Sequence, residues 1–287
     1  MKAFGTLLGE TFRRWNAHRV PRMGAALSFY AIFSLAPLAI LTLSLVSLAV
    51  GRDAARAEMV NQFRSQVGNE GADMVEMILT KTDGSHTSIM GTLIGFAVLL
   101  VGASGVFGEL QDSLNQIWEV STQRHPFFVM VKERAISFAM VFVMSFLMLV
   151  SFLFSAVIAA AGSYLHARLP ILDATWEWGN SAVSLPVSAL LFAIIFRVVP
   201  DTRITWGDVW LGALIAAILF VAGKLVLGFY FGRSAIASNY GAAGSLVIML
   251  VWVYYSAQIL FFGAEFTRVY ALRFGSHRGD DEVVKGN

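Results

Sequence analysis

Residues 244–264 decide the fold, and they read GSLVIMLVWVYYSAQILFFGA without a single charged side chain. At about 1.5 Å per residue, a helix of this length covers the roughly 30 Å hydrocarbon core of a bilayer. Glu265 follows directly and marks the return to polar surroundings. The stretch therefore predicts a transmembrane helix.

The composition of the whole chain agrees with this prediction. Of its 287 residues, 57% are hydrophobic and 14% are charged. In soluble domains roughly 45–50% of the residues are apolar and about 25% are charged. Soluble enzymes and nucleic-acid-binding modules are thereby disfavoured. The uncharged runs predict an all-α, polytopic integral membrane protein with six transmembrane helices, at about residues 23–51, 87–108, 135–162, 179–197, 208–232 and 243–266.

The positions of Lys and Arg predict the topology. They concentrate in the N-terminal segment, the second and fourth loops and the C-terminal tail. By the positive-inside rule both termini are cytoplasmic, which an even number of spans requires. We expect a basic cytoplasmic segment at 1–22, a transmembrane domain at 23–267 and a polar cytoplasmic tail at 268–287. The first apolar run is about twice as long as a signal-peptide core, so we expect it to be retained as an anchor.

Two segments outside the spans have helical patterns. In residues 1–22, Phe4, Leu7, Leu8 and Phe12 recur at helical spacing, which fits either a helix on the anionic leaflet or a solvated basic leader. In the long first outer loop, residues 52–86, apolar residues recur every three or four positions. This loop predicts two short amphipathic helices, broken near Gly68, that either cap a cavity or lie along the outer interface.

Lys224 is the charged residue that lies well inside a predicted span. A lysine in hydrocarbon costs a few kcal/mol, so it needs water or a partner. Two interpretations stay open: its side chain snorkels to the interface, or it faces a polar cavity and binds an anionic substrate. In the second case Asn239 and Tyr240, in the last outer loop, are the predicted substrate contacts at the outer mouth.

Carboxylates mark the inner ends of the spans. Glu109, Asp208 and Glu265 lie near several arginines there, including Arg197 and Arg268, which predicts carboxylate–guanidinium pairs. We assign Glu265 and Glu109 as candidate gating or proton-coupling groups. Pro37, which removes a backbone hydrogen bond inside the first span, is a candidate hinge.

Several chemistries have no support in the sequence. There is no cysteine, the five histidines fall in predicted loops or tails without metal-ligand spacing, and no phosphate loop or nucleophile elbow is present. We therefore expect no enzyme, no metal, no cofactor and no nucleic-acid partner. The Gly-xxx-Gly pairs at 91–95 and 228–232 permit a homodimer without requiring one.

Motifs spread along the chain resemble the YihY/BrkB family of bacterial inner-membrane proteins. They are AALSFY (25–30), FSLAPL (33–38), LQDSLNQIW (110–118), VPD (199–201), YGAAGS (240–245), WVYYS (252–256) and GAE (263–265). The resemblance implies six helices in the bacterial plasma membrane and a role in envelope integrity, virulence or lipid export. An older ribonuclease BN label for the family conflicts with this sequence, which offers no metal-binding cluster to activate a water.

These observations lead to two functional hypotheses. The first is a transporter or flippase of a lipid or other amphiphilic anion, with membrane lipids as its partners and Lys224 as the anion contact. The second is a non-transporting scaffold that holds envelope-assembly partners through its outer loop and basic cytoplasmic face. Substrate identity, direction, energy coupling and oligomeric state are not determined by the sequence.

Overall fold

The computed structural model describes residues 2–83, 102, 105–120, 173–233 and 242–278, and within them every regular element is a helix. The helices are α1 (Lys2–Ala17), α2 (Val20–Val50), α3 (Arg52–Val67), α4 (Asn69–Asp83), an unlabelled helix at 105–117, α7 (Asp173–Val198), α8 (Trp206–Arg233) and α10 (Ala242–Arg273). The all-α prediction is confirmed for these residues.

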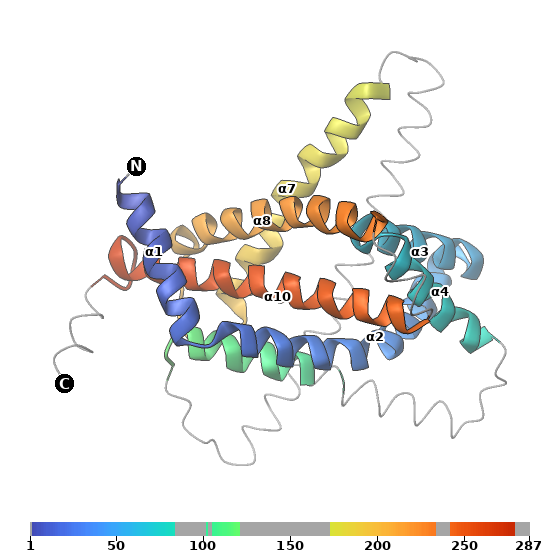
Figure 1. The fold of residues 1–287 in the computed structure, drawn as a ribbon, viewed down its shortest axis with the longest axis horizontal. Coiled ribbons are helices and arrows are strands. Elements are labelled where there is room, and N and C mark those ends of the chain that lie inside the picture. Colours follow the sequence, from blue (N-terminus) through green and yellow to red (C-terminus); the bar gives the residue numbers. More distant parts are fainter. Residues whose placement is uncertain (1, 84–101, 103–104, 121–172, 234–241, 279–287) are drawn as a thin grey trace.

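Helix α10 is the centre of the arrangement. It contacts α8 on one side and α2 on the other, and these three helices run side by side along the long axis (Figure 1). Helix α1 crosses the C-terminal end of α10, and the α3–α4 hairpin lies at the opposite end (Figure 1). We call these ends the α1 end and the α3–α4 end.

The prediction of six spans is confirmed only in part. Among the described residues, two helical segments, Trp206–Leu227 and Gly244–Arg273, are long and apolar enough to cross a membrane. Val20–Ala36 and Leu38–Ser44 form a third if the bent pair is one span, and Leu185–Val198 is a shorter apolar helix. The predicted span at 135–162 lies outside the described residues. Of the predicted span at 87–108, the structure describes only residues 102 and 105–108.

The bend in α2 lies where the sequence places a proline. The two segments around Pro37 are inclined at 44° to each other. Proline lacks the N–H that would donate to the preceding turn, and its ring crowds that turn, so a kink is the expected result. The predicted kink is confirmed, whereas a hinge motion there stays a prediction.

Glycines with positive φ separate the helices at the α3–α4 end. Gly51, with φ 86°, ends α2, and Gly68, with φ 89°, ends α3. Left-handed backbone of this kind favours glycine, which has no Cβ. The two predicted helices in the first outer loop are therefore confirmed, including the break at Gly68. They pack on α2 and α10 through apolar residues that include Leu43, Val75 and Met249.

Helix α1 also packs on the protein. Leu7 is buried against Phe266 and Val269 of α10, the ring of the half-exposed Phe4 lies 6.1 Å from that of Phe266, and Phe12 is exposed. The helical pattern of the N-terminal segment is thus confirmed. The segment is more than a solvated leader, because one of its faces belongs to the core of the protein.

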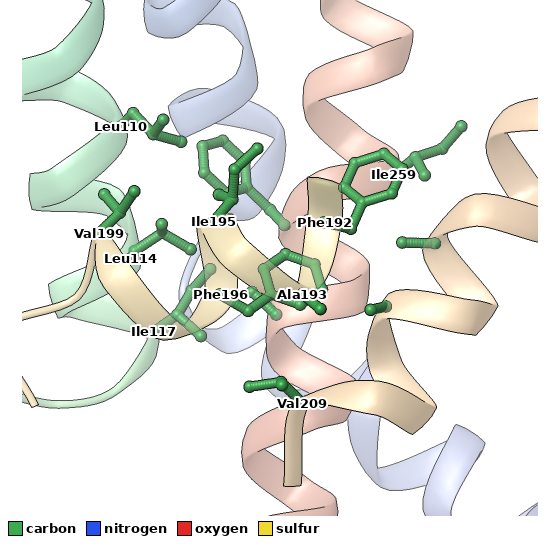
Figure 2. Packing of buried hydrophobic residues seen from close by; sticks show 14 of the residues in the cluster. Leu110, Leu114, Ile117, Phe192, Ala193, Ile195, Phe196, Val199, Val209 and Ile259 are labelled. Carbon is green, nitrogen blue, oxygen red and sulfur yellow. The ribbon is translucent and has the colours of Figure 1, made fainter. Parts of the chain in front are cut away.

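The largest core cluster joins α7, α8, α10 and the 105–117 helix. Figure 2 shows Leu110, Leu114 and Ile117 extending toward Ile195 of α7 and Val199, the residue that follows α7. On the other side of α7, Phe192 and Phe196 are buried in the same cluster with residues of α8 and α10. This packing fixes the α1 end of the bundle, where the candidate site lies.

Small residues bring α8 and α10 close together. A Cβ added to Gly212 would lie 2.6 Å from the backbone oxygen of Gly263 and would collide with the Thr267 hydroxyl. Backbone approach of this kind is typical of membrane helices, which associate through small residues. The glycine pairs that the sequence pattern singles out, at 91–95 and 228–232, lie outside the residues whose side chains the structure describes.

Candidate functional site: a buried carboxylate–histidine cluster

The candidate site forms around Glu265, whose carboxylate is completely removed from solvent. Helix α10 holds it at the crossing with α1. Its Oε1 lies 2.5 Å from Nδ1 of His18, and its Oε2 has no hydrogen-bond partner among the described residues. A carboxylate buried in an apolar setting is costly unless it is paired or protonated, so this position is sensitive to the charge of His18.

His18 lies in the tight turn between α1 and α2. Its N–H donates to the carbonyl of Arg14 at 2.8 Å, and the next residue, Arg19, has a left-handed backbone with φ 56°. This turn directs the imidazole toward α10, where it contacts a residue 247 positions away in sequence. The hydrogen bond to the Glu265 carboxylate raises the pKa of His18, against the opposing effects of burial and of Arg268.

The other ring nitrogen of His18 faces a second carboxylate. Its Nε2 lies 3.4 Å from Oε1 of Glu119, a residue with φ 51° that follows the 105–117 helix. Glu119 is partly exposed, in contrast to Glu265. The imidazole therefore connects a carboxylate at the surface to one inside the protein.

Arg268 holds Glu119 in place. Its Nη1 donates to Oε1 of Glu119, and its Nη2 pairs with Oε2, both at 2.7 Å. The same Nη1 donates to the carbonyl of Ile117, also at 2.7 Å. These hydrogen bonds lower the pKa of Glu119, with Arg14, 3.7 Å away, adding to the effect. Glu119 thus stays ionised at neutral pH.

We call Arg14, His18, Glu119, Glu265 and Arg268 the His18 cluster. An imidazole can accept a proton on one nitrogen while it donates from the other. Placed between Glu119 and Glu265, His18 can pass a proton from the surface to the buried carboxylate. Among the described residues, no group of three or more His, Asp or Glu side chains is arranged to hold a metal ion.

A second polar contact joins two of the sequence motifs. The amide of Asn115 donates to Oδ2 of Asp201 at 2.7 Å and accepts from the Asp201 N–H at 2.8 Å. Gln111 donates to the same carboxylate at 3.0 Å. We call this the Asp201 clamp. It ties the 105–117 helix to the loop between α7 and α8.

Glu109 lies beside the Asp201 clamp on the 105–117 helix. It accepts a long hydrogen bond of 3.5 Å from Ser113. Burial, with a contribution from Asp112, raises the pKa of Glu109. Among the described residues no contact links Glu109 to the His18 cluster, so its proposed gating role is separate from that of Glu265 and stays a prediction.

Lys224 lies in α8, about five helical turns from the start of that helix. Because α8 begins at the α1 end, Lys224 is distant from the His18 cluster. It is partly buried, and among the described residues it has neither an ion pair nor a hydrogen bond. Asn239 and Tyr240, the other predicted substrate contacts, lie outside the described residues. The choice between a cavity and snorkelling therefore stays open.

The arginines pair differently from the sequence expectation. Arg268 binds Glu119 rather than Glu265, and the guanidinium of Arg197 lies over the ring of Trp206 at 4.3 Å. Asp208 accepts hydrogen bonds from the hydroxyls of Thr205 and Ser276, at 2.7 and 2.5 Å. Thr205 and Asp208 form a capping arrangement at the start of α8. Sequence position identified the charged ends of the helices but not the partners.

His18 and Glu119 are the functional residues that sequence reasoning missed. His18 lies in a basic segment interpreted as a topology signal, and Glu119 in a short polar turn. The signal that was available is the position of Glu119 directly after the LQDSLNQIW motif, opposite the GAE motif that contains Glu265. Only the folding of α1 across α10 brings the two motifs to one histidine.

Known proteins match nearly the whole chain. The family model described as "Virulence factor BrkB" matches residues 11–285. A UPF0761 membrane protein of Ralstonia nicotianae is 28% identical over 88% of this chain and 56% of its own length. One of Alteromonas mediterranea is 25% identical over 91% of this chain and 86% of its own, and the putative ribonuclease-like protein YfkH of Bacillus subtilis is 24% identical over 91% and 93%.

Several of these relatives are longer than this chain, which spans about 56% and 57% of the first two. No solved structure matches. The family model, the relatives' description as membrane proteins and the apolar helices agree that this is an integral membrane protein. By the family model that covers residues 11–285, the chain belongs to the virulence factor BrkB family.

Proposed function

We propose that this protein is a transporter or flippase that moves a lipid or other amphiphilic anion across the bacterial plasma membrane and so contributes to envelope integrity. The observation that carries the proposal is the fully buried Glu265 carboxylate within 2.5 Å of His18. Ionisable groups inside membrane helices are costly and are typical of proton and substrate pathways. A purely structural contact at this position would be served by apolar side chains.

The coupling step uses the His18 cluster. With His18 protonated, its charge pairs with Glu265 and holds α1 against α10. Loss of that proton to solvent leaves Glu265 next to a neutral ring, which weakens the contact between the helices. Alternation between these states opens and closes the α1 end.

Substrate binding belongs to the other half of α8 in this proposal. Lys224 supplies a positive charge at membrane depth, and Asn239 and Tyr240 supply contacts at the outer mouth. The bend at Pro37 allows α2 to adjust between states. Because the His18 cluster pairs a histidine with a buried carboxylate, we expect a proton gradient to drive the cycle.

The experiment reconstitutes the purified protein in liposomes and follows the movement of fluorescent phosphatidylglycerol between leaflets by dithionite quenching. We compare wild type with Glu265→Gln and His18→Gln under an imposed pH gradient. We expect wild type to respond to the gradient and both variants to lose that response. His277→Gln is the matched control, because this histidine lies at the same end of the bundle but outside the His18 cluster.

A wild-type rate equal to that of protein-free liposomes, or equal responses of wild type and Glu265→Gln, would contradict the proposal. Lys224→Ala tests the substrate half in the same assay. We expect it to slow movement of the anionic lipid more than that of phosphatidylcholine, since only the anionic headgroup needs a cationic partner.

A scaffold function is the alternative, and the α3–α4 hairpin favours it. While its apolar face packs on α2 and α10, Asp53, Arg64, Asp73 and Glu76 on its outer side are exposed. This surface fits a protein partner outside the membrane. The scaffold hypothesis predicts that charge reversals here disturb the envelope, while Lys224→Ala and Glu265→Gln have no envelope phenotype.

A further inference from the structure

An open groove runs along α7 and α8. It has a volume of about 620 Å³ and is lined by residues of α7 between Leu185 and Leu190, residues of α8 between Gly207 and Leu214, and Tyr270 of α10. Nearly all of these side chains are apolar. Since α8 is one of the helices that can cross a membrane, the groove lies where lipid chains surround the protein.

One end of this groove has the character of a membrane interface. Trp206 and Trp210, in the first two turns of α8, are both exposed, and their rings lie 6.3 Å apart. Further along α8 the lining becomes aliphatic, with Leu211 and Leu214. Tryptophans gather at the headgroup level of a bilayer. The groove therefore has a headgroup end, near Trp206, and a chain end, near Leu214.

A cation lies at the headgroup end. Arg197 is partly exposed and its guanidinium stacks on Trp206 at 4.3 Å, while its Nη1 is buried and has no hydrogen-bond partner among the described residues. The nearby carboxylate of Asp208 is already bound by Thr205 and Ser276. Among the described residues no carboxylate pairs with Arg197, so its positive charge is uncompensated, and a phosphate at the exposed part of the guanidinium would supply a counter-charge.

Arg197 lies on the same face of α7 as the groove residues of that helix, and Trp206 lies on the same face of α8 as the groove residues Trp210 and Leu214. At the helical repeat of 3.6 residues per turn, Pro186, Leu190 and Arg197 lie on one face of α7. By the same repeat, Trp206, Trp210 and Leu214 lie on one face of α8. The Arg197–Trp206–Trp210 contacts connect the two stripes. A single amphiphile with a charged head and an acyl chain matches this order of groups.

We propose that this groove binds one anionic phospholipid of the leaflet at the α1 end, with its phosphate at Arg197 and one acyl chain along Leu190, Leu211 and Leu214. The charge complementarity at Arg197 selects an anionic lipid over a zwitterionic one. The site is distinct from Lys224, which lies further along α8, and it does not depend on proton transfer in the His18 cluster.

Native mass spectrometry of protein released from nanodiscs tests this site. The discs contain equal amounts of phosphatidylglycerol and phosphatidylcholine, and the ratio of the two lipids retained per protein is measured. We expect wild type to prefer phosphatidylglycerol and Arg197→Gln to lose about fivefold of that preference, the effect of one basic residue at a membrane surface. Arg203→Gln, which removes an exposed arginine from the adjacent loop, is the matched control.

A second pair of variants tests the part of the groove that would hold the acyl chain. Leu214→Trp fills the groove and should reduce retention of both lipids, whereas Leu225→Trp, on the exposed face of the same helix, should not. Arg197→Lys keeps the charge and should keep most of the preference, which separates lipid binding from loss of folding. Equal preference in Arg197→Gln and Arg203→Gln, or unchanged retention in Leu214→Trp, would overturn the proposal.

Discussion

Glu265 and His18 form a pair whose strength depends on a single proton. Because the Glu265 carboxylate is wholly buried and the His18 ring mostly so, the attraction between them is poorly screened by water. A charged imidazole satisfies the carboxylate, whereas a neutral one leaves it incompletely compensated. The raised pKa of His18 expresses the same coupling.

This coupling predicts how stability changes with pH. A group whose pKa is higher in the folded state stabilises that state fully below its unfolded pKa, about 6.5 for histidine, and loses the contribution as pH rises through the folded value. We therefore expect the melting temperature in detergent to fall as pH is raised through the raised pKa of His18. Glu265→Gln should flatten this part of the profile and destabilise the protein at low pH by about 1–3 kcal/mol.

His277→Gln provides the comparison for this prediction, because it removes a histidine from the same end without touching Glu265. Its profile should retain the wild-type slope. If Glu265→Gln also retains that slope, then another group is responsible for the pH dependence and the His18–Glu265 pair does not control the contact between α1 and α10.

Helices α8 and α10 approach each other through Gly212 and Gly263. In an isolated helix, Gly→Ala is stabilising by about 1 kcal/mol. At Gly212 the added methyl would meet the carbonyl of Gly263 at 2.6 Å, and a backbone atom cannot move aside cheaply. We expect Gly212→Ala to destabilise by about 1–3 kcal/mol, the range of overpacked cores, as measured by thermal unfolding in detergent.

Gly5→Ala and Gly9→Ala in α1 are matched controls for this substitution. A Cβ at either position meets no atom within 4 Å, so only the helix propensity remains and the melting temperature should rise. A Gly212→Ala protein as stable as these controls would show that α8 and α10 do not need their close approach.

The Asp201 clamp joins two elements through the side chain of one residue. Asn115→Ala removes both hydrogen bonds that connect its amide to Asp201, and it leaves the Asp201 N–H without that acceptor. We expect a loss of about 1–3 kcal/mol in the free energy of unfolding. Gln111→Ala removes a single bond of 3.0 Å and should cost less. Equal losses from the two substitutions would contradict the central role of Asn115.

The described part of the molecule has a direction, with α1 and the C-terminal end of α10 at one end and the α3–α4 hairpin at the other (Figure 1). The absence of cysteine from the sequence allows a direct test of this direction in the membrane. In intact cells, a membrane-impermeant maleimide should label Asp53→Cys in α3 and spare Arg278→Cys near the C-terminus. Permeabilisation should make both positions reactive. The opposite labelling pattern would reverse the predicted topology.

The tertiary arrangement also gives α1 two roles at the scale of the molecule. Its apolar side packs on α10 through Leu7, and the turn that follows it carries His18 into the candidate site. A change in the position of α1 therefore moves His18 relative to Glu265. We propose that this link between a surface helix and a buried carboxylate lets the α1 end act as a gate.

The sequence alone determined the features that depend on local composition. Uncharged runs predicted membrane helices, the glycine at 68 predicted the break between α3 and α4, and Pro37 predicted the bend in α2, because length, backbone freedom and a missing N–H act within a few residues. Glu265 was recognised as a candidate for the same reason: a carboxylate directly after an apolar run is conspicuous wherever the helix packs.

Only the tertiary structure decided which groups meet. His18 and Glu265 are 247 positions apart, Arg268 binds Glu119 across 149, and the glycines that bring α8 and α10 together are not those of the obvious sequence pairs. From the sequence alone, each charged side chain near a helix end could pair with several others. The crossing of α1 over α10 and the packing of α7 against the 105–117 helix select one set of them, because burial leaves room for a single arrangement.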